Sequence, residues 1–318
     1  MPCPLRFTLA SLLLALPATP ALAYEVCDLP PRYGLSELAI RIARVACDEN
    51  RQWYRPFIGL DGRLASQRVT EAESAELLDH GVPAWRRVVD YWQGSGTLAM
   101  LDRPGAASCR SALDERSAQS DCRAFVLDTP WSAAFVSWVM VQADVPGFHV
   151  SPSHIDYIAA SYRGRNGPYA YLDPATGKPE PGDLLCYLRG NRQAYGPAGL
   201  KAALAAGGDL PRKSHCDIVV AANVGGDRTL YLIGGNVLNA VTLRKLPLDA
   251  TGHAIPPTLP LSGTGGEDTD DPGTYCSPGN ESACDFNRQD WAVLLKLQVL
   301  PATAMPAYPS SARPDAAS

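Results

Sequence analysis

Residues 129–140 read Thr-Pro-Trp-Ser-Ala-Ala-Phe-Val-Ser-Trp-Val-Met. Thr129 suits the N-cap of a helix and Pro130 suits the first helical position, so the stretch predicts a helix that continues to about residue 143. Ser132 then lies in the first turn, where backbone N–H groups lack intrahelical acceptors and the helix dipole is positive. Those N–H groups could form an oxyanion hole beside Ser132.

The chain before this stretch is predicted to be largely helical. Apolar residues at helical spacing favour a helix over residues 34–58. A second helix is expected over residues 70–92, because Thr70 and Glu73 form a capping-box pattern and bulky apolar residues follow at helical spacing. Residues 93–128 are polar and contain glycine, and we expect a disulfide to hold them.

The chain after residue 143 changes to strand patterns. Apolar or alternating runs punctuated by Gly, Asp and Asn predict strands over residues 183–189, 216–224, 229–233, 240–246 and 292–300. Two long excursions, residues 190–214 and 249–289, separate some of these strands. Helices followed by a mostly antiparallel sheet define an α+β fold.

The N-terminal residues have the composition of a secretory leader. Arg6 supplies a positive charge, an apolar run follows, and Ala21-Leu22-Ala23 is a small-x-small cleavage pattern. The predicted organisation is a signal peptide over 1–23, a helical extension over 24–95, a main domain over 96–300 and a disordered tail over 301–318. No later segment is apolar over 18 residues, so we expect no membrane span after leader removal and a periplasmic or secreted location.

The cysteine count supports export. Nine cysteines become eight when Cys3 leaves with the leader, and an even count in an exported chain is typical of disulfides. Eight cysteines allow about 105 pairings. Spacing favours four pairs: Cys27–Cys47, Cys109–Cys122, Cys186–Cys216 and Cys276–Cys284. Zinc is the alternative, but neither Cys-x-x-Cys nor His-Glu-x-x-His occurs, so we expect no metal and no other cofactor.

The charge balance argues against one class of partner. The formal net charge of −5 becomes −6 when Arg6 leaves with the leader. An acidic chain of this kind does not fit a nucleic-acid partner, and it offers no polybasic segment for anionic membranes.

Three segments together point to chemistry: Trp131–Phe135, Ser214-His215-Cys216-Asp217 and Ile233-Gly234-Gly235-Asn236. Their order resembles the papain-like cell-wall hydrolases of the CHAP and NlpC type over roughly residues 125–246. In those families a nucleophile opens a helix, a Gly-Asp-Leu strand follows, a histidine leads the next strand and a third polar residue comes from the strand after that. The same segments also resemble a bacterial family of uncharacterised exported domains.

The resemblance implies a papain-like core in which a nucleophile-bearing helix packs on an antiparallel sheet. It also assigns roles. Ser132 stands where the peptidases have Cys, His215 is the base, and Asn236 orients the histidine. The residues themselves offer Asp217 as an alternative orienter, because positions 215 and 217 share a face of the strand and a carboxylate stabilises an imidazolium.

Further residues are candidates for the cleft or for bracing it. Trp131, His154 and Asp183 are expected near a bound substrate. Cys186 and Cys216 lie on strands that are neighbours in the resembled fold, so a bridge between them would fix the histidine strand. Each residue taken alone is more typical of a structural role: a serine that caps a helix, a packed histidine, an aspartate that fixes a turn.

The expected function is an exported hydrolase that cleaves an amide bond in peptidoglycan peptides through Ser132 and His215. The residues alone indicate acyl transfer, and the substrate class follows from the resemblance. Two alternatives stay open: a catalytically inactive papain-like protein that binds peptidoglycan fragments or an envelope protein, and a serine esterase.

Overall fold

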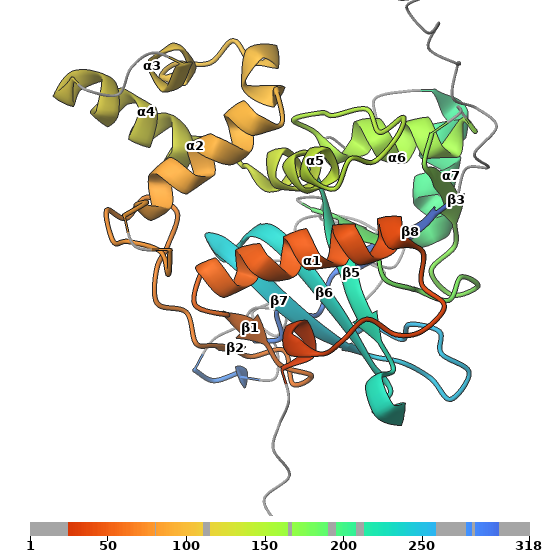
Figure 1. Ribbon diagram of the computed structural model, residues 1–318. Helices are drawn as coiled ribbons and strands as arrows, with labels where there is room; N and C mark the ends of the chain where they lie inside the picture. The colour runs from red at the N-terminus through yellow and green to blue at the C-terminus, as the bar shows by residue number, and fades with distance from the viewer. Residues whose placement is uncertain are drawn as a thin grey trace, which may run out of the picture.

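The structure is a computed structural model, and it describes residues 25–79, 81–110, 115–164, 167–189, 195–207, 213–258, 278–281 and 284–298. Within these ranges the chain forms seven α-helices packed with one eight-stranded sheet (Figure 1). The predicted α+β class is therefore confirmed.

The sheet is mostly antiparallel, with β1 and β7 as its one parallel pair among the described strands. Its order is β2-β1-β7-β6-β5-β4-β8-β3. The strands are β1 (Phe57–Ile58), β2 (Leu64–Ala65), β3 (Tyr169–Leu172), β4 (Leu184–Leu188), β5 (Ser214–Ala222), β6 (Thr229–Val237), β7 (Ala240–Pro247) and β8 (Asp290–Leu297).

The helices precede most of the strands in sequence. They are α1 (Glu37–Gln52), α2 (Ala84–Gly94), α3 (Ala106–Arg110), α4 (Arg116–Asp128), α5 (Ser132–Gln142), α6 (His154–Tyr162) and α7 (Gly196–Ala206). Three short 3-10 turns are also present: Val26–Asp28 before α1, Thr97–Met100 between α2 and α3, and Val224–Gly226 between β5 and β6. In Figure 1, α1 crosses in front of the central strands, α2 to α4 form a group to one side, and α5 and α6 lie above the sheet.

Strand alternation divides the apolar residues into two clusters. Along β4, Leu184, Cys186 and Leu188 join the large cluster formed with the helices. Leu185 and Tyr187 join a smaller cluster on the other face, which also contains Trp291. Successive side chains of a strand point to opposite faces, so one strand serves both clusters.

The residues before position 95 belong to the same core as the rest of the chain. Ile42 of α1 and Trp92 of α2 are buried in the cluster that contains Phe135 of α5. Trp53 stacks on Trp131 with ring centroids 5.8 Å apart. The predicted helical extension therefore packs into the main core.

Several predicted elements differ from the observed ones. The predicted helix over 70–92 is reduced to α2, which begins at Ala84. Half of the capping box forms, around an isolated turn: the Thr70 backbone N–H donates to the Glu73 carboxylate, but the Glu73 backbone N–H donates to the Thr70 carbonyl and not to its hydroxyl. Residues 93–128, described from the sequence as a polar, disulfide-bridged segment, contain α3 and α4. The strands β1, β2 and β3 and the helix α7 were not predicted, and β1 lies at the end of the predicted helix over 34–58. These elements are short or only weakly amphipathic, so periodicity gives little signal for them.

Disulfides staple three parts of the fold. Cys27–Cys47, Cys109–Cys122 and Cys186–Cys216 are all present, as the spacing predicts. The predicted pair Cys276–Cys284 includes Cys276, which lies outside the described residues. Three bridges are consistent with folding in an oxidising compartment.

No single helix in the described ranges is long and apolar enough to cross a membrane. One bent pair, α4 with α5, meets the length and composition criteria together, with an angle of 100° between its two helices.

Candidate functional site

The site begins at the N-terminus of α5. Trp131 is the N-cap, and Thr129, the predicted cap, instead ends α4. Ser132 is therefore the first helical residue. Among the described residues, the amides of Ser132, Ala133 and Ala134 donate to no acceptor, as expected for a first turn.

Ser132 is hydrogen-bonded to His154. The His154 Nε2 atom lies 2.8 Å from the Ser132 Oγ atom, and both side chains are buried. The other ring nitrogen of His154, Nδ1, contacts the Tyr157 hydroxyl. His154 opens α6 and Tyr157 follows one turn later, so α6 supplies both groups from one helix face.

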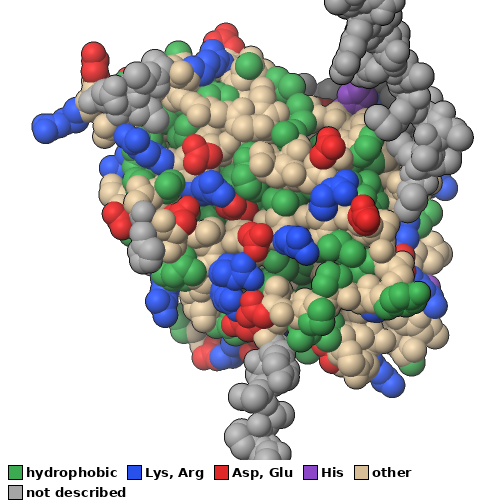
Figure 2. Space-filling model, in the orientation of Figure 1, with side chains coloured by type: hydrophobic (Ala, Val, Ile, Leu, Met, Phe, Trp, Pro, Cys, Tyr) green, Lys and Arg blue, Asp and Glu red, His purple; other side chains and the backbone are tan. Residues whose placement is uncertain are grey.

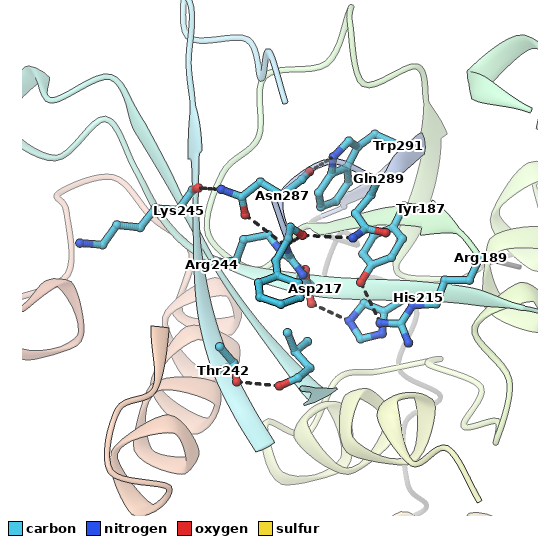
Figure 3. Close-up of polar contacts among 12 residues, drawn as sticks. Tyr187, Arg189, His215, Asp217, Thr242, Arg244, Lys245, Asn287, Gln289 and Trp291 are labelled. Atoms are coloured by element: carbon cyan, nitrogen blue, oxygen red, sulfur yellow. Dashed lines mark hydrogen bonds and ion pairs between the residues drawn. The ribbon is translucent and has the colours of Figure 1, made fainter. Parts of the chain in front are cut away.

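A second chain of contacts starts at His215 on β5. Its Nε2 atom lies 2.7 Å from Asp217 Oδ1, and the other oxygen of Asp217 accepts from Arg244 Nε at 3.0 Å. Arg244 donates in turn to Asn287 Oδ1 at 3.1 Å. Figure 3 shows these residues meeting from β5, β7 and the segment before β8.

The two chains of contacts meet at the histidine rings. The centroids of His154 and His215 are 5.2 Å apart. His215 has no hydrogen bond to Ser132, and its Nδ1 atom is buried without a partner among the described residues. The predicted pair Ser132–His215 is therefore not formed directly, because His154 occupies the hydrogen-bonding position on Ser132.

Asn236 does not reach His215. In the amide orientation that satisfies both of its ends, its oxygen accepts from the Trp131 backbone N–H and its nitrogen donates to Glu71, each at 3.1 Å. The Trp131 indole also donates to Glu71, at 2.6 Å. Of the two predicted orienters, Asp217 is therefore the one that contacts His215, and Asn236 braces the start of α5.

Two glycines of β6 make room for this arrangement. A Cβ atom on Gly234 would lie 1.9 Å from Asp217 Oδ1 and 2.9 Å from His215 Nε2. A Cβ atom on Gly235 would lie 2.4 Å from the Phe135 side chain. Gly234 thus leaves space for the His215–Asp217 hydrogen bond, and Gly235 lets β6 approach α5 closely.

Burial governs protonation at the site. Burial lowers the pKa of His215 to about 4, with the Arg189 charge as a further cause. Burial also holds the pKa of His154 well below its usual value, helped by His215 and Arg189. The pKa of Asp217 is lowered despite its burial, because His215 and Arg244 face it. At neutral pH both imidazoles are neutral, and Asp217 is an anion paired with Arg244.

Two other residues predicted to lie in the cleft, Trp131 and Asp183, are buried and make structural contacts. Trp131 is fully buried between the Trp53 and Tyr91 rings. Asp183 is buried, accepts from the Leu297 backbone N–H at 2.8 Å and pairs with Lys296 at 3.0 Å. Burial raises the pKa of Asp183 to about 6. Asp183 therefore ties the start of β4 to β8, and Trp131 belongs to the core.

Sequence reasoning missed Arg244, Glu71 and Asn287. Arg244 lies at an inward position of an alternating strand, where a charge is unexpected. The sequence did hold one signal, since a charged residue at such a position needs a buried partner. Glu71 and Asn287 lie in irregular segments, and no local pattern distinguishes them.

Metal binding finds no support in the described part of the chain, where no group of three or more His, Cys, Asp or Glu side chains is arranged to hold an ion.

Neither of the two cavities described here is lined by His154 or His215. A cavity of about 430 Å³ lies between α1 and the far end of β5. A smaller one, of about 190 Å³, is lined by Tyr157, Phe148 and Tyr169. On the face shown in Figure 2, acidic and basic side chains are interspersed with apolar ones, and no large area carries a single sign of charge.

Comparison with known proteins supports one relationship. Neither curated proteins nor solved structures gave a match to this chain. One family model, described as "Uncharacterized protein conserved in bacteria (DUF2272)", matches residues 79–297. This range holds α5, α6 and all the strands from β3 to β8, and with them both histidines. Because the match spans more than half of the chain, the protein belongs to the DUF2272 family of bacterial proteins.

Proposed function

We propose that this protein is an exported hydrolase with a papain-like core that uses Ser132 as a nucleophile on amide bonds of peptidoglycan peptides. The observation that carries the proposal is the 2.8 Å contact between Ser132 Oγ and His154 Nε2 at the start of a helix. A hydroxyl needs an adjacent base to become a nucleophile, and an imidazole nitrogen at this distance can be that base.

In the proposed reaction, the Ser132 hydroxyl proton moves to His154, which lies on α6. With the His154 proton on Nδ1 and donated to the Tyr157 oxygen, the Nε2 lone pair accepts the Ser132 proton as Oγ attacks the carbonyl carbon. The tetrahedral oxyanion is stabilised by the free first-turn amides of α5. The departing amine takes the proton from Nε2, and water then hydrolyses the acyl-Ser132 ester.

His215 and Asp217 support this step from the other side. The Nε2–H group of His215 donates to Asp217, which leaves the Nδ1 lone pair free and adjacent to the His154 ring. The pKa of His215 is about 4, so the positive charge by which it lowers the His154 pKa is present only in acid and does not oppose protonation of His154 at neutral pH. His215 is thus a positioning residue in this scheme.

One observation favours a second function, that of a binding protein without chemistry. Ser132 is 6% exposed and His215 is 0% exposed. Neither of the two cavities described above is lined by Ser132 or His215. If the site stays closed, the protein would keep its fold but would bind peptidoglycan fragments or an envelope protein elsewhere on its surface.

Labelling with a fluorophosphonate separates the two functions. We expect the mature chain to be labelled at Ser132 and to release soluble peptides from purified peptidoglycan. Both signals should be lost in Ser132→Ala and lowered about 100-fold or more in His154→Asn. Labelling that persists in His154→Asn but disappears in His215→Asn would instead make His215 the base.

Ser137→Ala is the matched control. Ser137 lies on the same helix, is equally buried and bonds only to Ser151. Its loss should leave labelling unchanged. If the unmutated chain is not labelled, releases no peptides from peptidoglycan and hydrolyses no simple ester, the binding function is the correct one.

A further inference from the structure

Arg189 is an exposed charged residue beside Tyr187, and the Tyr187 ring contacts the buried His215 ring. It follows directly after β4, and its backbone N–H donates to the Lys213 carbonyl at 2.7 Å. Its guanidinium donates to the Tyr187 hydroxyl at 2.8 Å and lies 5.2 Å from the centroid of the Tyr187 ring. The Tyr187 ring packs against His215 at a tilt of 36°, with centroids 5.0 Å apart, so a continuous path of contacts joins Arg189 to the site (Figure 3).

The charges around the histidines do not balance. Three ionised groups act on the two rings: Arg189, Asp217 and Arg244. Asp217 and Arg244 neutralise each other across 3.0 Å. Arg189 pairs with no carboxylate among the described residues, and its residue surface is exposed. The site therefore carries one uncompensated positive charge, and it belongs to a side chain that solvent reaches.

The guanidinium is also held in place. Stacking on Tyr187 and the hydrogen bond to its hydroxyl fix one edge of the group, while Tyr187 itself is 1% exposed. A guanidinium fixed in this way retains N–H donors that match the two oxygens of a carboxylate. Because the group is already oriented, little conformational entropy is lost when it binds an anion.

We propose that Arg189 is the substrate-recognition residue of this site and that it binds a carboxylate of the ligand. The inference rests on the proposed function for the location of the reacting bond, and it narrows the substrate to peptides with a free carboxylate near that bond. A peptide whose carboxylates are amidated would lose this contact and leave Arg189 unpaired.

Binding to a chain that cannot react tests the inference separately from catalysis. The probes are acetyl-L-alanyl-D-glutamate, with free carboxylates, and its fully amidated counterpart, titrated calorimetrically into mature Ser132→Ala protein. We expect the free acid to bind about 10- to 100-fold more tightly than the amide, the range for a hydrogen-bonded charge pair. Adding Arg189→Gln should remove this preference.

Two further variants sharpen the result. Arg189→Lys should restore part of the preference, because a lysine keeps the charge but not the two-pronged geometry. Arg32→Gln makes the same change in net charge at an exposed arginine beside the 430 Å³ cavity, and it should leave the preference intact.

Equal affinity for acid and amide, a preference that survives Arg189→Gln, or no binding of either probe at millimolar concentration would overturn the inference. Failure of the proposed function looks different. In that case the unmutated chain would not hydrolyse peptidoglycan, while the Ser132→Ala protein would still prefer the acid through Arg189.

Discussion

Gly234 shows how a single absent side chain can shape the site. Its hydrogen atom faces the His215–Asp217 pair, and a methyl group there would overlap Asp217 Oδ1 at 1.9 Å. We expect Gly234→Ala to lower the free energy of unfolding by about 1 to 3 kcal/mol, the usual cost of overpacking, as measured by urea denaturation. Gly279→Ala is the control, because a Cβ atom at position 279 meets nothing within 4 Å. Equal stability of the two variants would contradict the close fit.

Tyr157 tests the orientation of His154. Tyr157→Phe removes the hydroxyl from His154 Nδ1 but keeps the ring that packs on Phe148, with centroids 5.4 Å apart. Loss of one orienting hydrogen bond should slow fluorophosphonate labelling of Ser132 about 5- to 10-fold. Tyr171→Phe is the matched control, since the Tyr171 hydroxyl is buried without a partner among the described residues. If both variants react at the unmutated rate, Tyr157 does not orient the base.

The buried histidines should make the fold sensitive to acid. Burial lowers the pKa of His215 from 6.5 to about 4 and that of His154 well below 6.5. As the pH falls from about 6.5 towards 4, the unfolded chain gains protons that the folded chain does not bind. The free energy of unfolding should therefore fall, by up to about 1.4 kcal/mol per pH unit for each histidine. Asp183, whose pKa is raised to about 6, binds a proton in the folded chain over the same range and offsets part of this loss. Urea denaturation measures the net slope, which His154→Asn should reduce; an unchanged slope in that variant would contradict the prediction.

The sequence was enough to name most residues of the site but not the contacts between them. Ser132, His154, His215 and Asp217 all lie within one network of contacts. Strand alternation was enough to bring His215 and Asp217 to one face. The contact of Ser132 with His154 depends on how α6 packs beside α5, and that long-range packing leaves no local pattern in the sequence.

At the scale of elements, five of the eight strands were anticipated within a few residues, because β4 to β8 carry strong apolar patterns. Thr70 and Glu73 show the limit of local signals. The Glu73 carboxylate accepts from the Thr70 backbone N–H as in a capping box, yet no helix follows. A cap satisfies one helix end, but helix formation also needs a continuous face to bury, and the apolar face here begins only at α2.

The Cys186–Cys216 bridge joins β4 to β5 at paired positions, next to the pair Tyr187 and His215. Replacing both cysteines by alanine should lower the free energy of unfolding by about 2 to 4 kcal/mol, seen as a lower Tm. It should also slow labelling of Ser132, because β5, which carries His215, is then no longer covalently linked to β4. The Cys109–Cys122 double variant is the comparison: it should lose a similar amount of stability. Equal labelling by the two double variants would show that the Cys186–Cys216 bridge serves stability alone.

For the whole molecule, the notable feature is that the region before the family match is built into the core. The match begins at residue 79, yet α1 lies across the sheet (Figure 1). Asn50 of α1 donates to the Val241 carbonyl at 2.9 Å, and Glu71 holds the Trp131 indole at the start of α5. The N-terminal region thus supports the site through buried polar contacts.

Glu49 of α1 gives this dependence a measurable form. It is 3% exposed, pairs with Arg87 of α2 and accepts from the Tyr91 hydroxyl at 2.6 Å. Glu49→Ala would leave both α2 groups without their buried acceptor, so we expect a loss of about 3 kcal/mol in the free energy of unfolding. Glu37→Ala, at the exposed start of α1, is the control and should change stability by less than about 1 kcal/mol.

A single cooperative transition in both variants, with only Glu49→Ala shifted, is the result expected if α1 and α2 unfold together with the sheet. Separate transitions for α1 and α2 on one side and the sheet on the other would instead make these helices an independent unit, and their contacts would then not support the site.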